Sequence, residues 1–418
     1  MIDVRETPLH EAADIGSGGA SSTAHAPGRA AQATLVLVGS LVVLATAVIA
    51  PALPAIEAHF SGDPGSSVLV RLIITLPALV IAVAAPFAGY VLDRSERRPI
   101  VFWALIGFVI FGTAGVAVDS LEVLLATRAG LGLSVAFLMA GFTSLVGDLF
   151  EPEQRAAIMG RQVSANSIIS LSMIFAAGAL TQIDWHAAFL IYLVAAPLVA
   201  AFWIYVPNPP RALAATSVAP DGGGQRLSGT VIAVYALAIT GPLLFLLIPT
   251  QAPFLIAETH GGTSLTIAIA MGASTLGVLP GSLLFPRLRK AMSPFALFGL
   301  AFAVMGAGFV LQGLAPSLAL LVAAMGIAGV GFGLMMPNLS TTLLAAAPPA
   351  MRGRLSGGLV SSIFLGQFLS PLASQPLVNA YGYEQTFIAA GYAFILVAGI
   401  AALRGLLVDR PRASSKLG

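Results

Sequence analysis

The chain has 418 residues, of which 57% are hydrophobic and only 9% are charged, and its mean hydropathy is +0.93. Soluble domains carry roughly 25% charged residues, so this composition excludes an ordinary soluble protein and indicates an integral membrane protein. The formal net charge of +2 argues against binding to nucleic acid, and the absence of cysteine excludes disulfides and thiol-ligated metals. With five scattered histidines, we predict no metal site and no other cofactor.

The first 31 residues are polar and rich in Ala, Gly and Ser, and we expect a disordered cytoplasmic tail there. They do not resemble a signal peptide, because the apolar run that follows is longer than the apolar core of a signal. Later apolar runs recur at lengths that suit a bilayer, which takes about 20 residues per helix. We predict twelve spanning helices, at 34–57, 67–91, 99–118, 121–147, 157–182, 186–206, 229–256, 264–286, 293–313, 317–345, 355–379 and 383–408.

A Pro- and Gly-rich linker divides these helices six and six. We therefore predict an all-α membrane protein with an N-terminal bundle at 32–206, a linker at 207–228, a C-terminal bundle at 229–408 and a tail at 409–418. An internal repeat supports pseudo-symmetric halves, because Gly89…Arg97-Arg98 recurs as Gly281…Arg289-Lys290. The second copy lacks the acid of the first, since Phe285 stands where Asp93 would be.

The basic residues predict the orientation of the chain. With both termini in the cytoplasm, every Lys and Arg except Arg71 and Arg128 lies in a segment on the cytoplasmic side. Arg71 is near the outer start of the second helix. Arg128 is inside the fourth.

A compact group of charges follows the second span, where residues 89–99 read Gly-Tyr-Val-Leu-Asp-Arg-Ser-Glu-Arg-Arg-Pro. One interpretation is a stop signal that keeps the loop in the cytoplasm. The other is a conformational latch, in which Gly89 allows a neighbouring helix to approach closely and Asp93 faces the positive end of another helix. Arg97 would then pair with Asp93 or with a third acid.

This stretch resembles the signature loop between the second and third helices of the major facilitator superfamily, Gly-x-Leu-x-Asp-Arg-x-Gly-Arg-Lys. Gly89, Asp93 and Arg94 match that pattern, as do Arg97 and Arg98, whereas Val91 and Glu96 depart from it. The resemblance covers about residues 34–408. It implies two six-helix bundles around a central cavity, and secondary transport by alternating access.

A second loop also resembles the superfamily. Asp148, Pro152 and Arg155 are similar to its Asp…Pro…Arg pattern at the end of the fourth helix. The resemblance implies that Asp148 pairs with Arg97, and we expect an Asp93–Arg97–Asp148 network that closes the cytoplasmic side in the outward-facing state. The alternative is a solvated loop acid. The predicted latch comprises Gly89, Asp93, Arg94, Arg97, Arg98, Asp148 and Arg155.

Arg128 lies inside the fourth span, where a charge is costly and suggests a functional residue. The alternative is an arginine that extends to the outer face, towards Asp119 or Glu122. The segment resembles a superfamily motif in which an arginine precedes Gly-x-Gly, here Gly130 and Gly132, and that arginine is implicated in proton coupling or substrate handling.

No Asp or Glu falls in the middle of a predicted span. A coupled proton would therefore need an acid at the outer rim, an inner acid such as Asp148, or a site linked to Arg128. The predicted coupling residues are Arg128, Glu57 and Glu122.

Neutral polar side chains inside the spans are the candidates for a substrate cavity, although each could instead hold helices together. An uncharged cavity suits neutral, amphipathic or weakly polar solutes and argues against phosphates or di-acids. Phe245 and Phe254 would add aromatic walls. The predicted cavity residues are Thr46, Gln162, Asn166, Tyr235, Gln251, Asn338 and Gln367.

We predict a monomeric, proton-coupled exporter of a small organic solute, a drug or a sugar-like metabolite, in a bacterial inner membrane. Residues 164–178 lack the Gly-Pro that drug–proton antiporters of the superfamily carry in this helix. Metabolite uptake or facilitated diffusion is the first alternative, and a receptor or scaffold without transport is the second. No convergent Ser/His, paired Asp or metal-ligand set in the spans favours an enzyme.

Overall fold

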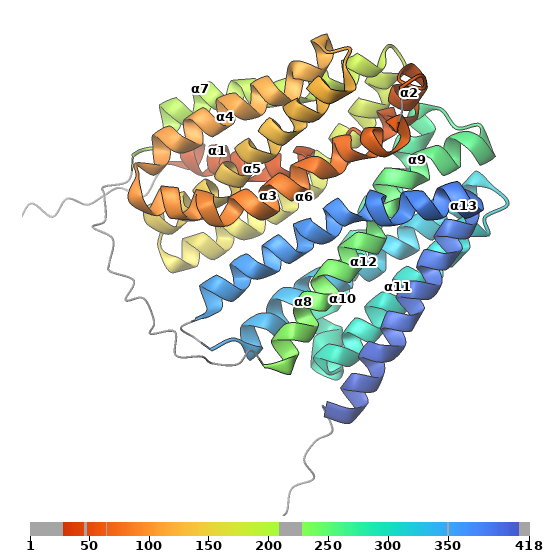
Figure 1. Cartoon of the computed structure of the whole chain (residues 1–418). Coiled ribbons are helices and arrows are strands. Elements are labelled where there is room, and N and C mark those ends of the chain that lie inside the picture. The colour runs from red at the N-terminus through yellow and green to blue at the C-terminus, as the bar shows by residue number, and fades with distance from the viewer. Residues whose placement is uncertain (1–27, 46–47, 64, 209–227, 349–350, 409–418) are drawn as a thin grey trace, which may run out of the picture.

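The computed structural model describes residues 28–45, 48–63, 65–208, 228–348 and 351–408 (Figure 1). Every regular element within these ranges is a helix, which confirms the predicted all-α fold. Residues 1–27 of the predicted N-terminal tail, the predicted C-terminal tail and most of the central linker lie outside the described residues, whereas residues 29–31, which were also predicted to be disordered, form the start of α1. The N-terminal half contains α1 (Arg29–Ser40), η1 (Leu41–Ala45), η2 (Ala50–Ala52), α2 (Leu53–His59), α3 (Ser66–Arg94), α4 (Arg97–Thr113), η3 (Ala114–Ala117), α5 (Leu121–Leu149), α6 (Pro152–Thr181), η4 (Trp185–Ala195) and α7 (Ala196–Tyr205). The C-terminal half contains α8 (Gly229–Phe245), α9 (Leu247–His260), α10 (Ser264–Ala291), α11 (Pro294–Gly313), α12 (Leu318–Ala346) and α13 (Arg352–Val408).

The described chain forms 11 helical stretches that are long and apolar enough to cross a membrane. The last of them contains Gly382 at φ 80° and ψ 173°, a conformation that favours glycine and divides α13 into two rods. Counting the two rods separately gives the twelve predicted spans, with the break between the predicted helices at 355–379 and 383–408.

Local sequence explains where several spans begin and bend. Ser120, Ser228, Ser293 and Ser317 each accept a hydrogen bond from a backbone N–H at the start of the following helix. The seventh span breaks into α8 and α9 at Leu246, because Pro242 removes a backbone donor from the helix. The fifth span begins at residue 152, one turn before the predicted start.

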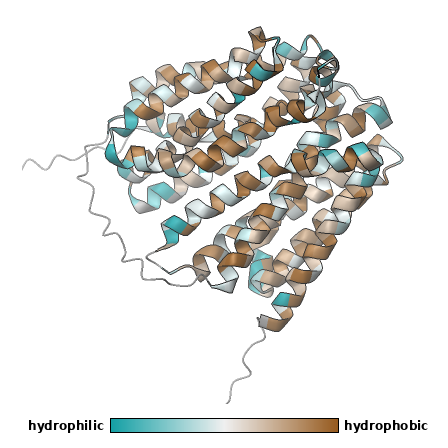
Figure 2. Cartoon of the chain, in the orientation of Figure 1, coloured by the Kyte–Doolittle hydropathy of each residue, from teal (hydrophilic) through white to brown (hydrophobic). Residues whose placement is uncertain are grey.

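The two halves form separate bundles that lie side by side (Figure 1). We call the end where α7 finishes and α8 begins the linker end, and the opposite end, at α2 and the α13 bend, the distal end. The bundles meet where α3 contacts α13, α6 contacts α10 and α2 contacts α9. Apolar residues cover the helix lengths, while polar residues gather near the helix ends (Figure 2).

Small residues let α10 and α12 approach within backbone contact. A Cβ atom built on Gly281 would overlap the carbonyl of Val330, and one on Gly329 would overlap the carbonyl of Ser274. The close approach predicted at Gly89 is wrong for this structure, because a Cβ there would meet nothing within 4 Å. The repeated glycines Gly89 and Gly281 therefore differ, because only Gly281 lies against the backbone of a neighbouring helix.

Candidate functional site

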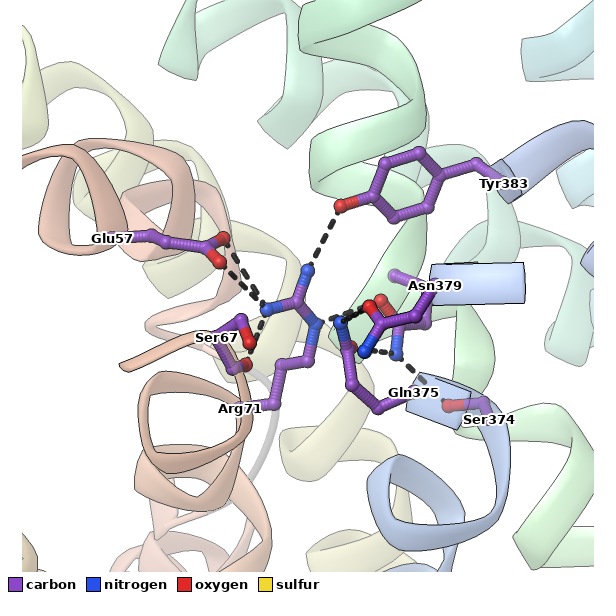
Figure 3. A network of polar contacts seen from close by, with 8 residues as sticks. Glu57, Ser67, Arg71, Ser374, Gln375, Asn379 and Tyr383 are labelled. Atoms are coloured by element: carbon purple, nitrogen blue, oxygen red, sulfur yellow. Dashed lines mark hydrogen bonds and ion pairs between the residues drawn. The ribbon is translucent and has the colours of Figure 1, made fainter. Parts of the chain in front are cut away.

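A buried arginine near the distal end joins the two bundles (Figure 3). The side chain of Arg71, on α3, is 0% exposed. Its Nη1 lies 3.2 Å from a carboxylate oxygen of Glu57 on α2 and also donates to the carbonyl of Ser67. These partners all belong to the N-terminal bundle, so the positive charge is balanced within its own half.

The other nitrogens of Arg71 donate to the C-terminal bundle. Nε donates to Gln251 Oε1 at 2.8 Å and Nη2 donates to Tyr383 Oη at 2.9 Å. The guanidinium carbon lies 3.9 Å from the ring centre of Phe254, a cation–π contact. We call Glu57, Arg71, Gln251, Phe254 and Tyr383 the Arg71 clamp.

A second layer of amides supports the clamp within the C-terminal bundle. The Nε2 of Gln251 donates to Ser374 Oγ at 2.9 Å and to Gln375 Oε1 at 3.1 Å. Gln375 in turn donates to Asn379 Oδ1 at 2.9 Å. Because Gln251 is fixed by these contacts, its carbonyl oxygen is available to accept the hydrogen bond from Arg71.

A buried cation needs both a counter-charge and filled hydrogen bonds, since desolvation otherwise opposes burial. The Arg71 clamp supplies the counter-charge from its own bundle, through Glu57, whereas the acceptors Gln251 and Tyr383 are supplied only while the bundles touch. Sequence reasoning placed Arg71 near the outer start of the second helix without giving it a role, and it assigned Glu57 and Gln251 to separate sites. Arg71 lies inside the helical span Ser66–Arg94, so the argument applied to Arg128 would have singled it out as well.

The charged loop after α3 brings together the predicted Asp93, Arg97 and Asp148. Arg97 Nη1 pairs with the Asp148 carboxylate, and Arg97 Nη2 lies 3.8 Å from Asp93. All three residues belong to the N-terminal bundle. Their role in closing the cytoplasmic side stays a prediction.

The remaining latch residues also contact their own bundle. Arg94 lies over the Tyr90 ring at 3.7 Å, and Arg98 lies over Trp203 and donates to its carbonyl. Arg155 Nε donates to the Phe150 carbonyl at 2.7 Å.

Arg128 is buried, at 1% exposure, in the interior of the N-terminal bundle. Its Nη2 donates to the carbonyls of Phe111 and Gly112 at 2.6 and 2.9 Å, at the C-terminal end of α4. Its guanidinium carbon also lies 4.9 Å from the ring centre of Phe189. Arg128 therefore ties α5 to α4 and η4, because cations suit a helix C-terminus. Its recorded contacts do not include the acids named in the alternative interpretation.

Those acids lie at the distal surface instead. Glu122 accepts from Ser120 Oγ at 2.8 Å, beside the first turn of α5. Asp119 lies 2.9 Å from His186 Nε2, and Asp184 lies 2.7 Å from His186 Nδ1. The backbone N–H and ring of His186 donate to Asp184 and hold the pKa of that loop carboxyl below its usual range.

A cavity of about 370 Å³ is lined by residues of both bundles. None of the described residues that line it carries a charge. Asn166 contributes an Oδ1 that has no hydrogen-bond partner among the described residues. Opposite it, the rings of Phe245 and Phe332 stack with centroids 4.0 Å apart. The lining consists of Val43, Asn166, Ser167, Ser170, Phe245, Ser274, Thr275, Val278 and Phe332.

Of the predicted cavity residues, Asn166 lines this space, as does the aromatic Phe245. Gln162 donates to the Gly39 carbonyl at 2.8 Å, and Asn338 donates to the Pro294 carbonyl at 2.9 Å, so both hold helices together. Gln251 belongs to the Arg71 clamp.

Two further candidates lie on the C-terminal bundle. Tyr235 donates to the Leu355 carbonyl at 2.9 Å, and Gln367 has a buried Oε1 without a recorded partner. Thr46 lies outside the described residues. Sequence reasoning missed Ser167, Ser170, Ser274 and Thr275, because small hydroxyl residues are common throughout membrane helices.

Comparison with known families matches almost the whole chain. The family model described as Major Facilitator Superfamily matches residues 35–233 and again 227–418. The chain belongs to the major facilitator superfamily. It is a multi-pass membrane protein and a secondary transporter, and it is not an enzyme.

Two curated relatives are bacterial transporters. The uncharacterized transporter YebQ of Escherichia coli (strain K12) is 25% identical, over 91% of this chain and 95% of its own. The multidrug efflux pump LfrA of Mycolicibacterium smegmatis is 27% identical over 68% of this chain and 52% of its own.

Solved structures share the fold. A bacterial homologue of the human lysosomal transporter Spinster, in an inward-facing and occupied conformation, aligns with a TM-score of 0.71 and 19% identity, over 92% of this chain and 98% of its own. A D-xylose–proton symporter aligns with a TM-score of 0.73 and 16% identity, over 89% of this chain and 96% of its own.

Proposed function

We propose that this transporter exports an uncharged or weakly polar organic solute across a bacterial inner membrane, in exchange for protons. The observation that carries the proposal is the uncharged lining of the cavity, to which both bundles contribute, while the Arg71 clamp joins the same bundles near the distal end. A site at the interface of the two repeated halves, with contacts between them that can break and re-form, is what alternating access requires.

The chemistry of the cavity favours a solute with one apolar face. Phe245 and Phe332 offer an aromatic surface, while Asn166 adds an amide to the lining. A phosphate or di-acid would leave its charge unpaired against this lining. A neutral aromatic or hydroxyl-bearing compound fits better.

The orientation follows from the distribution of Lys and Arg, which predicts the linker end in the cytoplasm. The distal end, where the Arg71 clamp joins the bundles, is then the outer side. Export is supported by the similarity to an efflux pump. The fold shared with a proton symporter keeps uptake or facilitated diffusion as the alternative.

Coupling to protons requires an acid whose protonation changes with conformation. Of the three predicted coupling residues, Glu57 contacts a residue that joins both bundles. Glu122 lies at a surface helix start, and the recorded contacts of Arg128 lie within one bundle. We therefore favour Glu57 as the acid that senses the conformation.

The test is substrate-induced dequenching of a pH-sensitive dye in energised inverted vesicles, with a panel of neutral aromatics, sugars, cationic drugs and di-acids. We expect neutral or weakly polar compounds to dequench, and Asn166→Leu to raise the concentration needed for half the effect. Gln312→Leu, a buried amide that bonds to its own helix, is the matched control. Counterflow of a labelled solute without any dequenching would reject proton-driven export and favour facilitated diffusion.

A further inference from the structure

The two halves of the Arg71 clamp differ in charge. Every recorded C-terminal partner of Arg71 is a neutral side chain, whereas its ion-pair partner, Glu57, belongs to the N-terminal bundle. The side chain of Arg71 is 0% exposed and that of Glu57 is 23% exposed. The acid therefore lies where distal solvent reaches it, while the cation does not.

We propose that Arg71 is the positioning residue that holds the distal end shut, and that a proton taken up by Glu57 releases it. The proposal rests on the alternating-access function above, and it adds which residues form the distal gate and what opens it. The clamp is closed with Glu57 ionised. It opens when Glu57 is neutral.

An ionised Glu57 balances the guanidinium, so that the Arg71–Glu57 pair has no net charge where Arg71 contacts its neutral partners in the C-terminal bundle. Once Glu57 is protonated, the guanidinium is left as an uncompensated charge in a buried site. Separation of the bundles relieves this cost, because it lets water reach Arg71.

The neighbouring charges do not offer a substitute counter-ion. Glu258, on α9, is close enough to act electrostatically on Tyr383, but the contacts recorded for Arg71 do not include it. His59, on the same short helix as Glu57, faces Asp119, Trp185 and His186 within the N-terminal bundle. Tyr383 is a neutral hydroxyl that accepts a hydrogen bond from Arg71, so it supplies no negative charge. Glu57 is accordingly the acid whose charge decides the state of the clamp.

The chain has no cysteine, which makes a distance measurement across the gate straightforward. Spin labels at Ser61→Cys and Thr259→Cys would sit on exposed distal positions that follow α2 and end α9, one on each bundle. Double electron–electron resonance in nanodiscs between pH 8 and pH 5 then gives the populations of the closed and open distal ends, without any substrate.

We expect the closed population to dominate at pH 8 and the open one to grow as the pH falls. Glu57→Gln should shift the ratio towards open by about tenfold or more at pH 8 and remove its dependence on pH. Glu57→Asp, which keeps the charge, should retain the pH response. Adding Arg71→Leu to Glu57→Gln should recover part of the closed population, since no buried cation then lacks a counter-charge.

Controls separate this gate from general effects. Glu258→Gln and Asp63→Asn remove other acids at the distal end and should leave the pH profile unchanged. A pH response that persists in Glu57→Gln, or one that disappears in Glu258→Gln, would overturn the proposal. If Glu57→Gln does not fold, a flat pH profile in the unsubstituted chain would overturn it equally.

The two proposals fail independently. A pH-dependent distance change that Glu57 controls, together with silent vesicle assays, would keep the gate and reject proton-driven export. Dequenching in the vesicle assay, together with a distance distribution that does not change with pH, would keep proton-driven export and reject the gate.

Discussion

Gln251→Leu tests how strongly the Arg71 clamp holds the bundles together. Gln251 is 0% exposed, and its Oε1 accepts the Nε–H of Arg71 at 2.8 Å. Leucine has a similar volume but no acceptor, so the substitution leaves one guanidinium donor unpaired. This loss applies only to the closed distal end, because water can pair with Arg71 once the bundles separate.

The expected size follows from the type of bond that is lost. A hydrogen bond to a charged group contributes about 1.5–3 kcal/mol, which corresponds to a roughly 10- to 150-fold change in an equilibrium constant. The contacts of Gln251 with Ser374 and Gln375 are also lost. Those two residues can pair with other polar groups or water, so we assign no additional energy to them.

The assay is the rate at which Thr75→Cys reacts with a maleimide at constant pH. Thr75 is 0% exposed and lies one turn beyond Arg71 on α3, so the label should reach it after the distal end opens. We expect Gln251→Leu to speed the reaction by about 10- to 150-fold. The control Gln312→Leu, which removes a buried amide that bonds to its own helix, should leave the reaction rate unchanged. A rate within about twofold of the parent, in protein that folds normally, would refute the reasoning about Arg71.

Three further predictions concern residues outside the clamp. Arg128→Met should lower the melting temperature and leave dye dequenching measurable in the surviving protein, whereas full loss of transport at an unchanged melting temperature would indicate a direct role in coupling. Gly281→Ala should destabilise the protein by about 1–3 kcal/mol in thermal unfolding because the new Cβ overlaps α12, while Gly89→Ala should be neutral or slightly stabilising. Asp184→Asn should lower the melting temperature at pH 7, and this loss should shrink as the pH falls below about 3.9, because a carboxyl whose pKa is depressed in the folded state stabilises that state above its unfolded pKa and loses the effect as the pH falls through the folded value. A loss that stays constant as the pH falls would show that the charge is irrelevant.

The number and position of the helices could be predicted from the sequence because bilayer thickness sets their length. The break at Gly382 was also predicted, because this residue at positive φ falls between the predicted helices at 355–379 and 383–408. The sequence did not predict the division of the first span into α1, η1, η2 and α2, the last of which carries the Glu57 that pairs with Arg71.

The cavity was harder to predict, because helices in a membrane are apolar on both their lipid-facing and buried sides. Asn166 and Asn338 are the same residue type, and both were predicted to face the substrate. Asn166 lines the cavity, whereas Asn338 bonds to the Pro294 carbonyl on the neighbouring helix. Nothing in the local sequence distinguishes them, since the difference lies in how α6 and α12 are rotated within their bundles.

Arg71 and Arg128 show the same limit for charged residues. Burial of either side chain is costly, so both positions could be flagged from sequence, but the cost does not reveal the partner that offsets it. The contacts of Arg128 lie within the N-terminal bundle, at the carbonyls of Phe111 and Gly112 near the C-terminal end of α4, 17 and 16 residues away. Those of Arg71 lie 180 and 312 residues away, in the other bundle. Only the second arrangement changes when the bundles move relative to each other, and for that reason Arg71 is the arginine whose environment must differ between the two ends of a transport cycle.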